Sequence, residues 1–468
     1  MYSWQEPTDL PADPIHLCSR LQHMDCPVLL HSGMSIGAYG DWSIVACNPA
    51  LLLRSRGDEV SVEVRDGSAG EGRPLGACGD ALETLERLWR SFPAPAGPSP
   101  LPFRGGFIGY LSYDLGRLLE SLPATARDDL AAPDMLLGLY TAALLVDHRA
   151  QLTWACGYSA QGREAAQAAA RALEHTARTG RPASRDGGPA TDGRLTGNFT
   201  REQYLGALRR TIEYIHAGDI FQANLSQRFQ GTVRITPWEL YRRLAEINPA
   251  PFAAYLGFDD IQLVSASPER FVLVRDGLVE TRPIKGTRPR GADPAADQAL
   301  ARELLASAKD AAELTMIVDL ERNDLGRVCR FGSIEVPQLV VLESYPTVHH
   351  LVATVVGRLR PEATNVDLLR ATLPGGSITG APKIRAMEII EELEPTRRGP
   401  YTGCIGYLGL DGRVDLNIVI RTIAVLDRTA YFQVGGGVVA DSDPEEEYVE
   451  TLVKGRAPAR ALDAGLPQ

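Results

Sequence analysis

Hydrophobic and polar residues in the second half of the chain alternate in patterns that predict both helices and strands. Behind the capping box Thr200-Arg-Glu-Gln203, aliphatic residues recur at helical spacing at positions 205, 208, 212 and 215. Further helices are expected near 295–319, 382–393 and 443–455, and strands at 262–266, 271–274, 333–336, 414–420 and 430–434. Because regular βαβ alternation is missing, the pattern predicts an α+β fold with mixed or antiparallel sheets.

The first half of the chain shows short apolar segments separated by turns, such as 136–146, and ends in a helix expected at about 161–178. The following stretch, 179–198, is rich in Gly, Pro, Arg, Asp and Ser and has no hydrophobic period, so it predicts a flexible linker. We therefore divide the chain into an N-terminal region (1–178), this linker, and a C-terminal region (199–458).

The composition excludes several classes of protein. The chain has 468 residues and a formal net charge of -11, which argues against binding to nucleic acids or membrane surfaces. Its seven cysteines are scattered and never form a Cys-x-x-Cys pair, so neither a disulfide framework nor a zinc site is expected. The N-terminus lacks the features of a signal peptide, and no apolar run approaches the roughly 20 residues of a membrane span. We expect a cytoplasmic protein.

The segment from Glu280 to Gly291 carries one lysine, Lys285, among three arginines at positions 282, 288 and 290. Pro283 restricts the backbone two residues before the lysine, and Gly286 just after it allows a substrate to approach closely. Neighbouring like charges favour the neutral, nucleophilic form of an amine, and the arginines would hold an anionic substrate. The same pattern is typical of a loop that binds an anion by charge alone, in which Lys285 has no catalytic role. The spacing leaves both interpretations open.

Two pairs of acidic residues are three residues apart on predicted helices, Asp310 with Glu313 and Glu447 with Glu450. Each pair therefore lies on one helix face and could supply the oxygen ligands that Mg²⁺ prefers. The second pair has another explanation. The residues 443–446 are an N-cap, a proline and two glutamates, and a helix dipole favours acidic residues in a first turn without any metal.

Two glycine-rich segments suggest anion-binding backbone. The segment 375–383 lacks a lysine directly after its last glycine, so it is no phosphate loop. It is instead a turn into a helix whose first position is Pro382, and the free amides there could bind an anion such as a carboxylate. The segment 435–440 has no surrounding βαβ unit, so we interpret it as a backbone nest and not as a dinucleotide site.

These features belong to a longer ordered series of motifs. The series comprises 218–226, 267–270, 283–290, 308–314, 319–324, 349–351, 374–383, 406–407, 420–422 and 435–442, with a weaker match at 103–110. In this order the motifs resemble those of the chorismate-utilising enzymes over about residues 199–456, and the chain is identified as a member of that family. The resemblance implies sheets packed face to face with helices outside, and an N-terminal region that contributes strands to the same body.

The resemblance also implies roles for individual residues. Lys285 is the implied nucleophile, Glu269 the general acid that protonates the departing ring hydroxyl, and His350 a residue near the reacting ring. The residues implied to bind substrate are Thr379, Tyr407, Arg421, Gly435, Gly436, Gly437 and Lys454. Those implied to bind Mg²⁺ are Glu313 and Glu450, with Asp310 and Glu447 assisting through water. Without the resemblance, Glu269 would be a surface turn residue and Arg421 a strand-end arginine in an ion pair.

Two positions separate the activities within the resembled family. Gln222 stands where the water-adding relatives carry a lysine as general base, and a neutral amide cannot activate water in that way. Lys285 stands where anthranilate-forming relatives usually carry alanine and relatives that form 4-amino-4-deoxychorismate carry lysine. The resemblance therefore implies Mg²⁺-dependent formation of 4-amino-4-deoxychorismate, a precursor of 4-aminobenzoate and folate, from chorismate and ammonia. The alternatives are an anthranilate-forming enzyme and a chorismate-binding regulator without activity.

Two possible binding partners are a glutaminase subunit, expected from motifs that the sequence lacks, and tryptophan, suggested by a partial motif match. The chain has no Gly-x-Cys-x-Gly or His-Pro-Glu motif of a glutamine amidotransferase, so a separate glutaminase subunit is expected to supply ammonia. A tryptophan pocket of the anthranilate-forming relatives has counterparts in Ser32, Asn248 and Pro249, but its Glu and Met are replaced by His31 and Ala253. The resemblance leaves a bound tryptophan open and does not support feedback inhibition.

Overall fold

The computed structural model describes residues 2–34, 40–65, 73–75, 79–185, 187–345 and 348–467 and contains two 12-stranded sheets. Every pairing between named strands is antiparallel, which confirms the predicted α+β fold. The first sheet has the order β1 (Tyr2–Thr8), β10 (Leu152–Ser159), β9 (Ala142–Asp147), β3 (Trp42–Ala46), β2 (Val28–His31), β13 (Phe252–Gly257), β14 (Gln262–Ser267), β23 (Thr422–Leu426), β24 (Thr429–Val438), β12 (Gln222–Thr232) and β11 (Thr196–Gly197), with β20 (Gly380–Ala381) paired to β12.

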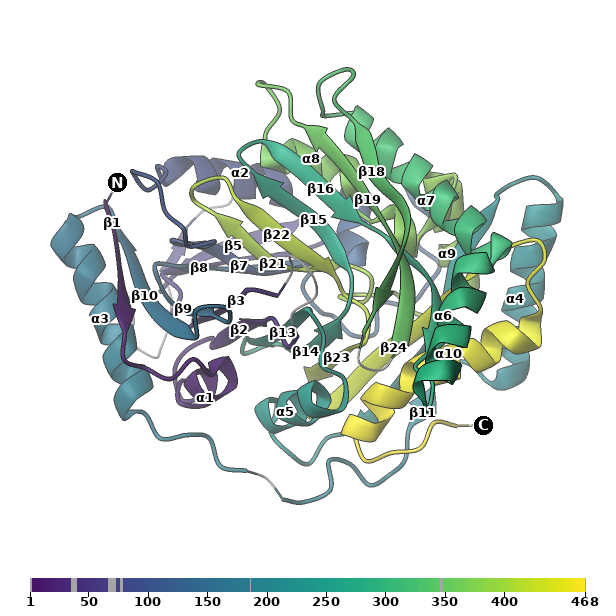
Figure 1. Cartoon of the computed structure of the whole chain (residues 1–468), viewed down its shortest axis with the longest axis horizontal. Coiled ribbons are helices and arrows are strands. Elements are labelled where there is room, and N and C mark those ends of the chain that lie inside the picture. Colours follow the sequence, from purple (N-terminus) through teal and green to yellow (C-terminus); the bar gives the residue numbers. More distant parts are fainter. Residues whose placement is uncertain are drawn as a thin grey trace.

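The second sheet lies across the first (Figure 1). Its order is β17 (Ile284–Pro289), β19 (Val348–Arg358), β16 (Leu278–Arg282), β15 (Arg270–Arg275), β22 (Val414–Ile418), β21 (Cys404–Gly409), β7 (Gly106–Leu111), β8 (Met135–Tyr140), β4 (Leu51–Arg56), β5 (Glu59–Val64) and β6 (Arg73–Leu75), with β18 (Glu335–Ser344) also paired to β19. Each sheet contains a block of strands from each half of the sequence, and the two blocks pair at one junction. Leu30 of β2 pairs with Ala254 of β13, and Gly109 of β7 pairs with Gly406 of β21.

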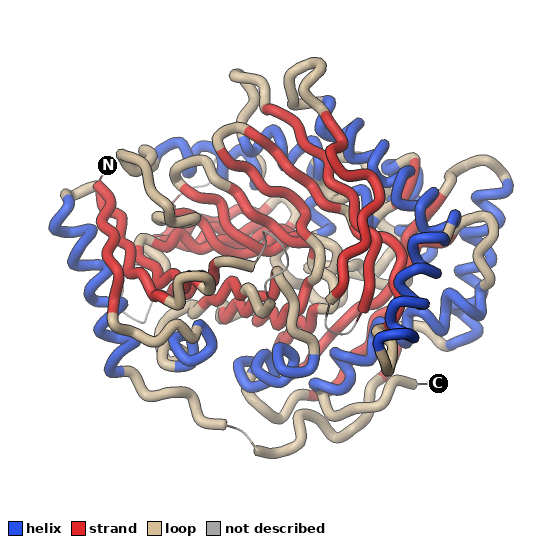
Figure 2. Tube along the Cα trace, viewed as in Figure 1, coloured by secondary structure: helices blue, strands red, loops and turns tan. Residues whose placement is uncertain are grey.

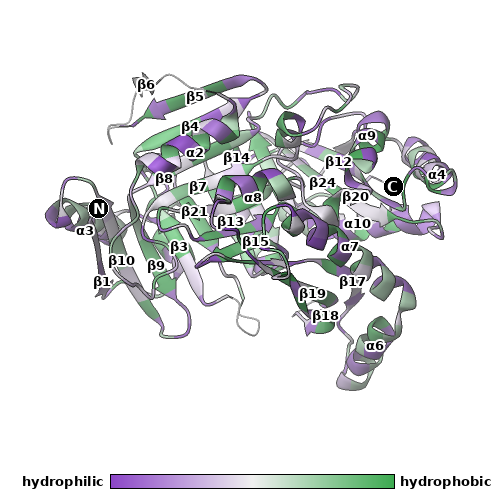
Figure 3. Cartoon of the chain, turned by 90° about the horizontal axis from the view of Figure 1, so that it is seen from above, coloured by the Kyte–Doolittle hydropathy of each residue, from purple (hydrophilic) through white to green (hydrophobic). Residues whose placement is uncertain are grey.

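Helices cover the outer faces of the sheets (Figure 2). They are α1 (Pro14–Ser19), α2 (Ala81–Ser91), α3 (Arg163–Thr179), α4 (Arg201–His216), α5 (Pro237–Ile247), α6 (Pro294–Ala306), α7 (Ala308–Gly326), α8 (Asn365–Thr372), α9 (Lys383–Leu393) and α10 (Pro444–Ala461), with short 3-10 helices η1 (Tyr113–Leu118) and η2 (Gly376–Ile378). The helices α4, α9 and α10 gather at one end of the molecule (Figure 3). No helix of the described residues is long and apolar enough to cross a membrane.

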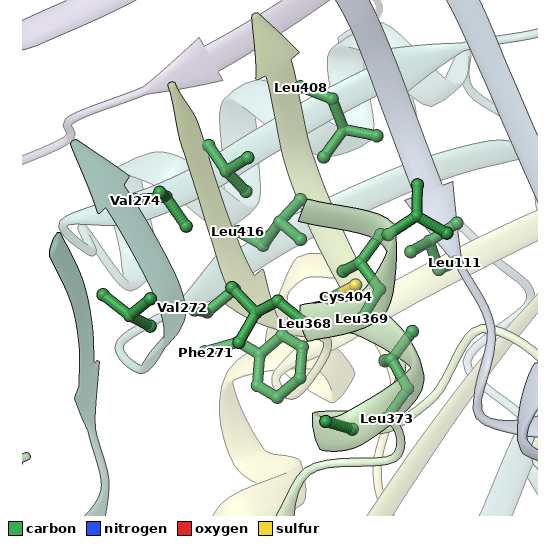
Figure 4. Close-up of a cluster of buried hydrophobic side chains, with 14 of the residues drawn as sticks. Leu111, Phe271, Val272, Val274, Leu368, Leu369, Leu373, Cys404, Leu408 and Leu416 are labelled. Atoms are coloured by element: carbon green, nitrogen blue, oxygen red, sulfur yellow. The ribbon is translucent and has the colours of Figure 1, made fainter. Parts of the chain in front are cut away.

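Strand β21 shows why the inner strands are apolar on both faces. Side chains alternate along a strand, so Ile405 and Tyr407 point to the layer between the sheets, while Cys404 and Leu408 point to the helix side. Figure 4 shows the helix side, where side chains of β21 pack against Leu368 and Leu369 of α8 and against Leu373, its C-cap. Because one face is covered by the other sheet and the opposite face by helices, these strands are continuous apolar runs.

Several predicted elements are confirmed, and some boundaries differ. The capping box at Thr200 starts α4, with both reciprocal hydrogen bonds present, and Asp443 is the N-cap of α10. The single helix predicted at 295–319 is wrong. Two helices form there because the Ser307 side chain accepts a hydrogen bond from the Asp310 N–H and so starts α7 anew. Pro382 is the N-cap of α9 and not its first helical residue.

The segment 179–198 is almost without regular structure in its described part, but its second half packs on the body. Ala190 and Leu195 are buried in the same cluster as residues of the first sheet. The Thr191 hydroxyl donates to the Leu462 carbonyl at 2.8 Å, and Thr196–Gly197 pair with β12. The predicted flexibility of this segment stays a prediction. The six described cysteines are free and buried, and Cys78 lies outside the described residues.

Candidate active site

Lys285 is on β17, and its amine lies where residues of β12, β24 and η2 come together. Pro283 separates β16 from β17, and both strands pair with the same edge of β19. The Lys285 Nζ donates to the Ser377 carbonyl at 3.3 Å. A Cβ placed on Gly437 would lie 3.3 Å from this Nζ and 2.8 Å from Nε2 of Gln222. The nucleophile predicted from sequence therefore faces a glycine strand and a buried amide.

Burial is the main cause that lowers the pKa of Lys285, and the charge of Lys454 adds to it, while Glu313, Glu269 and Glu450 oppose it. The sequence-based explanation, in which three arginines lower this pKa, is wrong. Each of them is neutralised by an acid, as shown by the pairs Arg282–Glu343 at 2.6 Å, Arg288–Glu303 at 2.7 Å and Arg290–Asp297 at 2.6 Å. They hold the loop in place, and Lys285 is not a member of a cluster of unpaired cations.

Glu269 is buried and faces Lys285, so the alternative of a surface turn residue is wrong. Its carboxyl group interacts with the Ser377 hydroxyl and the Ile284 N–H, and Lys285 and Arg421 are the nearest charges. Burial outweighs these contacts and raises the pKa of Glu269. A buried carboxyl with a raised pKa suits a general acid.

His350 has one free nitrogen in the site. Its Nδ1 lies 3.2 Å from the Gly286 carbonyl and 2.9 Å from the Thr287 hydroxyl. A carbonyl oxygen only accepts, so the imidazole proton is on Nδ1 and Nε2 is an acceptor. That Nε2 is buried and has no hydrogen-bond partner among the described residues. Burial and the charge of Arg421 lower the pKa of His350 to about 3.

The four predicted metal-binding acids are neighbours at the ends of α7 and α10. A Cβ on Gly436 would lie 3.0 Å from Glu447 Oε2 and 3.6 Å from Glu450 Oε1. Burial raises the pKa of Glu313, and the charges of Asp310 and Glu450 add to that rise. Lys454 donates to the Gly435 carbonyl at 2.9 Å and pairs with Glu450 at 2.7 Å.

The oxygens of these four acids are not gathered as a ligand set. In the part of the chain that the structure describes, the one group of three or more metal-ligating side chains within 4.8 Å is Asp25, Cys26 and Asp259. The Arg65 guanidinium already donates to both oxygens of Asp25, at 2.9 and 3.0 Å, so this group is an ion-pair cluster.

Arg421 is a second cation beside Glu269, in addition to Lys285. It has a positive φ of 50°, is in the left-handed region just before β23, and forms no hydrogen bond or ion pair with another described side chain. Burial lowers its pKa, and Tyr345 and Glu269 are its nearest titratable groups. The alternative of a strand-end arginine in a surface ion pair is therefore wrong. Its guanidinium is available for an anionic ligand.

The two glycine-rich segments take different forms. Thr379 is fully buried, and its hydroxyl donates to the Gly375 carbonyl at 2.9 Å, so it closes the turn around η2. Gly435, Gly436 and Gly437 are in the extended strand β24 and pair with Ser226, Leu225 and Asn224 of β12. The backbone nest predicted for 435–440 is wrong because this strand pairing continues to Val438.

Tyr407 lies away from the site, against expectation. It lines a cavity of about 390 Å³ together with Ser32 and Phe252, and its ring packs on Phe103 at 5.5 Å. Tyr401 is the tyrosine near the glycine-rich turn. Its ring lies 5.7 Å from the Arg398 guanidinium, which also donates to the Ile378 carbonyl at 3.0 Å.

The same cavity contains part of the predicted tryptophan pocket. Ser32 is in its wall, but Asn248 and Pro249 are not, and residues 251–254 line it instead. Asn248 ends α5 and is buried. A bound tryptophan stays a prediction for this cavity.

The rarity of lysine among the basic residues is a simple sequence signal that the predictions above did not use. Of 48 basic residues only four are lysines, at positions 285, 309, 383 and 454. Lys309 and Lys454 act on the acids around Lys285, and Lys383 pairs with the buried Asp324 at 2.5 Å. A chain that uses arginine nearly everywhere keeps lysine where a compact or neutral amine is needed. Gln222, whose buried amide has no partner among the described residues, is a second residue whose isolation only the structure shows.

Comparison with known proteins identifies the family of the chain. A family model described as chorismate binding enzyme matches residues 40–460. The chain belongs to the chorismate binding enzyme family. It is thus a chorismate-utilising enzyme, as the sequence predicted.

Its relatives include enzymes of two kinds. Aminodeoxychorismate synthase component 1 of Salmonella typhimurium is 44% identical over 94% of this chain and 93% of its own length. Anthranilate synthase component 1 of Thermus thermophilus is 45% identical over 82% of this chain and 84% of its own length. The solved anthranilate synthase component I of Streptococcus pneumoniae is 34% identical, covers 91% of this chain and 93% of its own, and superposes with a TM-score of 0.78. Overall identity therefore does not separate the two activities.

Proposed function

We propose that this protein converts chorismate and ammonia into 4-amino-4-deoxychorismate, with Lys285 as a covalent nucleophile. The observation that supports this best is the position of Lys285, an amine whose pKa burial lowers, close to the carboxyl of Glu269, whose pKa burial raises. A neutral amine and a protonated acid are the two forms that such a substitution requires.

The proposed reaction has two substitutions with balanced protons. The lone pair of Lys285 Nζ forms a bond to C2 of the ring, both ring double bonds shift, and the C4–O bond breaks. Glu269 gives its proton to the departing oxygen, which leaves as water, while the attacking amine loses a proton. Ammonia then forms a bond at C4 and loses a proton, both double bonds shift back, and the C2–N bond to Lys285 breaks as the lysine regains a proton. The enolpyruvyl group is retained.

In this proposal, hydrogen-bond donors without a partner in the protein bind the carboxylates of the substrate. Chorismate carries two carboxylates, and the unpaired guanidinium of Arg421 suits one of them. Gly435, Gly436 and Gly437 allow a close approach because a Cβ at any of them would meet a neighbouring atom at 2.5 to 3.0 Å. Thr379 supports the turn that carries Ser377. The Nε2 of His350 can accept a hydrogen bond from a ring hydroxyl.

The four acids at the other end of the site are of the donor type that holds Mg²⁺, and their oxygens would have to move together to bind it. Glu313 and Glu450 would hold the ion, with Asp310 and Glu447 near it, because these are hard oxygen donors in an anionic cluster. Lys285, Lys309 and Lys454 reduce the repulsion among them, and Arg288 pairs with Asp310 at 3.4 Å. Glu450 would have to leave Lys454 to bind an ion. When bound, Mg²⁺ would supply positive charge for a substrate carboxylate.

Ammonia is proposed to come from a separate glutaminase subunit. The relatives named above carry the term component 1, which points to a partner component for those proteins, and this chain lacks the motifs of a glutamine amidotransferase. Anthranilate formation remains the second candidate because a relative with that activity is equally similar. Lys285 is the feature against it.

Product analysis tests the proposal. The purified protein is incubated with chorismate, ammonium and Mg²⁺, and the product is identified by mass spectrometry, by fluorescence and by an assay for pyruvate. We expect a non-fluorescent product that retains the enolpyruvyl group, and no release of pyruvate. Fluorescent anthranilate formed together with one equivalent of pyruvate would reject the proposed activity in favour of the second candidate.

A further inference from the structure

Asn224 is a polar residue near Lys285 to which the reaction described above gives no role. It is on β12, two residues after Gln222, so both side chains are on the same face of that strand. Its partner across the ladder is Gly437 of β24, the glycine where an added Cβ would meet both Gln222 and the Lys285 Nζ. Asn224 therefore belongs to the strand segment that borders the nucleophile.

The side chain of Asn224 is bonded to the glycine-rich turn. Its Nδ2 donates to the Ser377 carbonyl at 2.9 Å, and because a carbonyl oxygen only accepts, the amide has this one orientation. The backbone of Asn224 is fixed as well. Its N–H donates to the Thr379 carbonyl at 2.7 Å, and its carbonyl accepts from the Arg398 Nη2 at 2.5 Å. The amide is thus held in one place relative to the turn.

The Ser377 carbonyl connects this amide to Lys285. Ser377 is in η2, is 5% exposed, and its carbonyl also accepts a hydrogen bond from the Lys285 Nζ at 3.3 Å. Within the described part of the chain these two side chains are its donors, and no backbone N–H bonds to it. A carbonyl oxygen has two lone pairs, so Asn224 and Lys285 together satisfy it.

This shared carbonyl sets the direction of the Lys285 lone pair. A neutral amine has two N–H groups and one lone pair, and an acceptor oxygen can face only an N–H. While Nζ donates to Ser377, its lone pair therefore points away from the turn. When the amine moves to C2 of the ring it leaves the carbonyl, and Asn224 remains as the donor. Without Asn224 the attack would leave a buried carbonyl with no donor, which is unfavourable.

We propose that Asn224 is a positioning residue for the attack by Lys285. Its amide holds the Ser377 carbonyl in the place where that oxygen orients the amine, and it keeps the carbonyl hydrogen-bonded while the amine is attached to the ring. This inference rests on the proposed function. Asn224 keeps its own protons throughout, so the proton balance of the two substitutions is unchanged.

The test compares Asn224→Ala with the wild type in the covalent step alone. Each protein is mixed with chorismate and Mg²⁺ without ammonia, the reaction is quenched at short times, and the adduct on Lys285 is quantified by mass spectrometry. At saturating chorismate we expect the adduct to form about 10-fold more slowly, which is the effect of losing one hydrogen bond of ordinary strength. The chorismate concentration that gives half the maximal rate should stay within twofold, because Asn224 acts on the amine and not on the substrate.

Asn365→Ala is the matched control. The Nδ2 of Asn365 also donates to a backbone carbonyl at 2.9 Å, that of Gly412, and Asn365 is half-buried like Asn224 but lies at the start of α8. It should lose a similar amount of thermal stability and form the adduct at the wild-type rate. Asn224→Asp keeps the size of the side chain without the N–H donor, so it serves where Asn224→Ala does not fold, and it should be slowed at least as much.

The outcomes separate this inference from the proposed function. A folded Asn224→Ala or Asn224→Asp protein that forms the adduct at the wild-type rate would overturn the inference and leave the proposed function standing. Equal slowing in Asn365→Ala would also overturn it, because the effect would then follow stability and not position. A wild-type protein that forms no adduct would overturn the proposed covalent step, and the inference with it.

Discussion

The side chains of Lys285 and Gln222 meet at Gly437, where an added Cβ would lie 3.3 Å from the lysine Nζ and 2.8 Å from the glutamine Nε2. Gln222 is fully buried, and neither of its amide atoms has a hydrogen-bond partner among the described residues. The amide can therefore bind a small polar molecule next to the nucleophile. It can donate or accept a hydrogen bond, but unlike an amine it cannot take a proton from water.

Gly437→Ala tests this arrangement. The new methyl group would displace the ends of Gln222 and Lys285, and we expect the rate of ammonia-dependent turnover to fall by about 100-fold, because misplacing a reacting group by about 1 Å has an effect of that size. Thermal unfolding should change little, since both side chains are flexible. Gly206→Ala in α4 is the control, because a Cβ there meets no atom within 4 Å. It should raise stability by about 1 kcal/mol and leave the rate unchanged.

His350 should affect stability at acid pH rather than carry charge in the reaction. Its folded pKa, about 3, lies below the ordinary value of 6.5, so the unfolded chain binds a proton first as the pH falls. Stability from this group is present above pH 6.5 and falls by up to about 1.4 kcal/mol per pH unit between 6.5 and 3. Denaturant titrations at several pH values should show a smaller acid loss for His350→Gln. The exposed His23→Gln should keep the wild-type slope, and an unchanged slope for His350→Gln would refute the assignment.

Removal of metal should stop the reaction. Dialysis against EDTA is expected to abolish turnover, and added Mg²⁺ should restore it. Glu313→Gln should reduce the rate by orders of magnitude because it removes a charged oxygen ligand. Glu446→Gln, an exposed acid on α10 beside Glu447, should behave as wild type. Full activity after exhaustive EDTA treatment would contradict a role for the metal.

The source of ammonia can be tested with the isolated chain. It should consume chorismate with ammonium salts at alkaline pH, where free NH₃ is present, and fail with glutamine as the nitrogen donor. Addition of a glutaminase subunit should make glutamine effective. Glutamine-dependent turnover by the pure chain alone would show an amidase site that the sequence does not reveal.

The sequence predicted the roles that depend on local order. Lys285 lies two residues after a proline and directly before a glycine, Thr200 starts a helix, and each acidic pair on α7 and α10 lies on one helix face. These features could be predicted because each depends on residues within a few positions. The motif order was enough to indicate the family and the α+β fold.

Other features depend on residues distant in sequence, and there the sequence was a poorer guide. The arginines of the 280–291 segment looked unpaired because their acids, Glu343 and Glu303 among them, come from other elements. Tyr407 was placed at the substrate, yet strand alternation turns it toward the layer between the sheets. The isolation of the Gln222 amide is visible only when every neighbour is known.

The most direct measurement is the mass of the protein after reaction with chorismate and Mg²⁺ in the absence of ammonia. We expect an adduct of chorismate minus water on Lys285, and the other three lysines, 309, 383 and 454, should remain unmodified in the peptide map. Lys285→Arg keeps a long basic side chain but removes the nucleophilic amine, so it should form no adduct and turn over far more slowly. If Lys285→Arg makes 4-amino-4-deoxychorismate at the wild-type rate and the wild type forms no adduct, Lys285 is only an anion contact and the account is wrong.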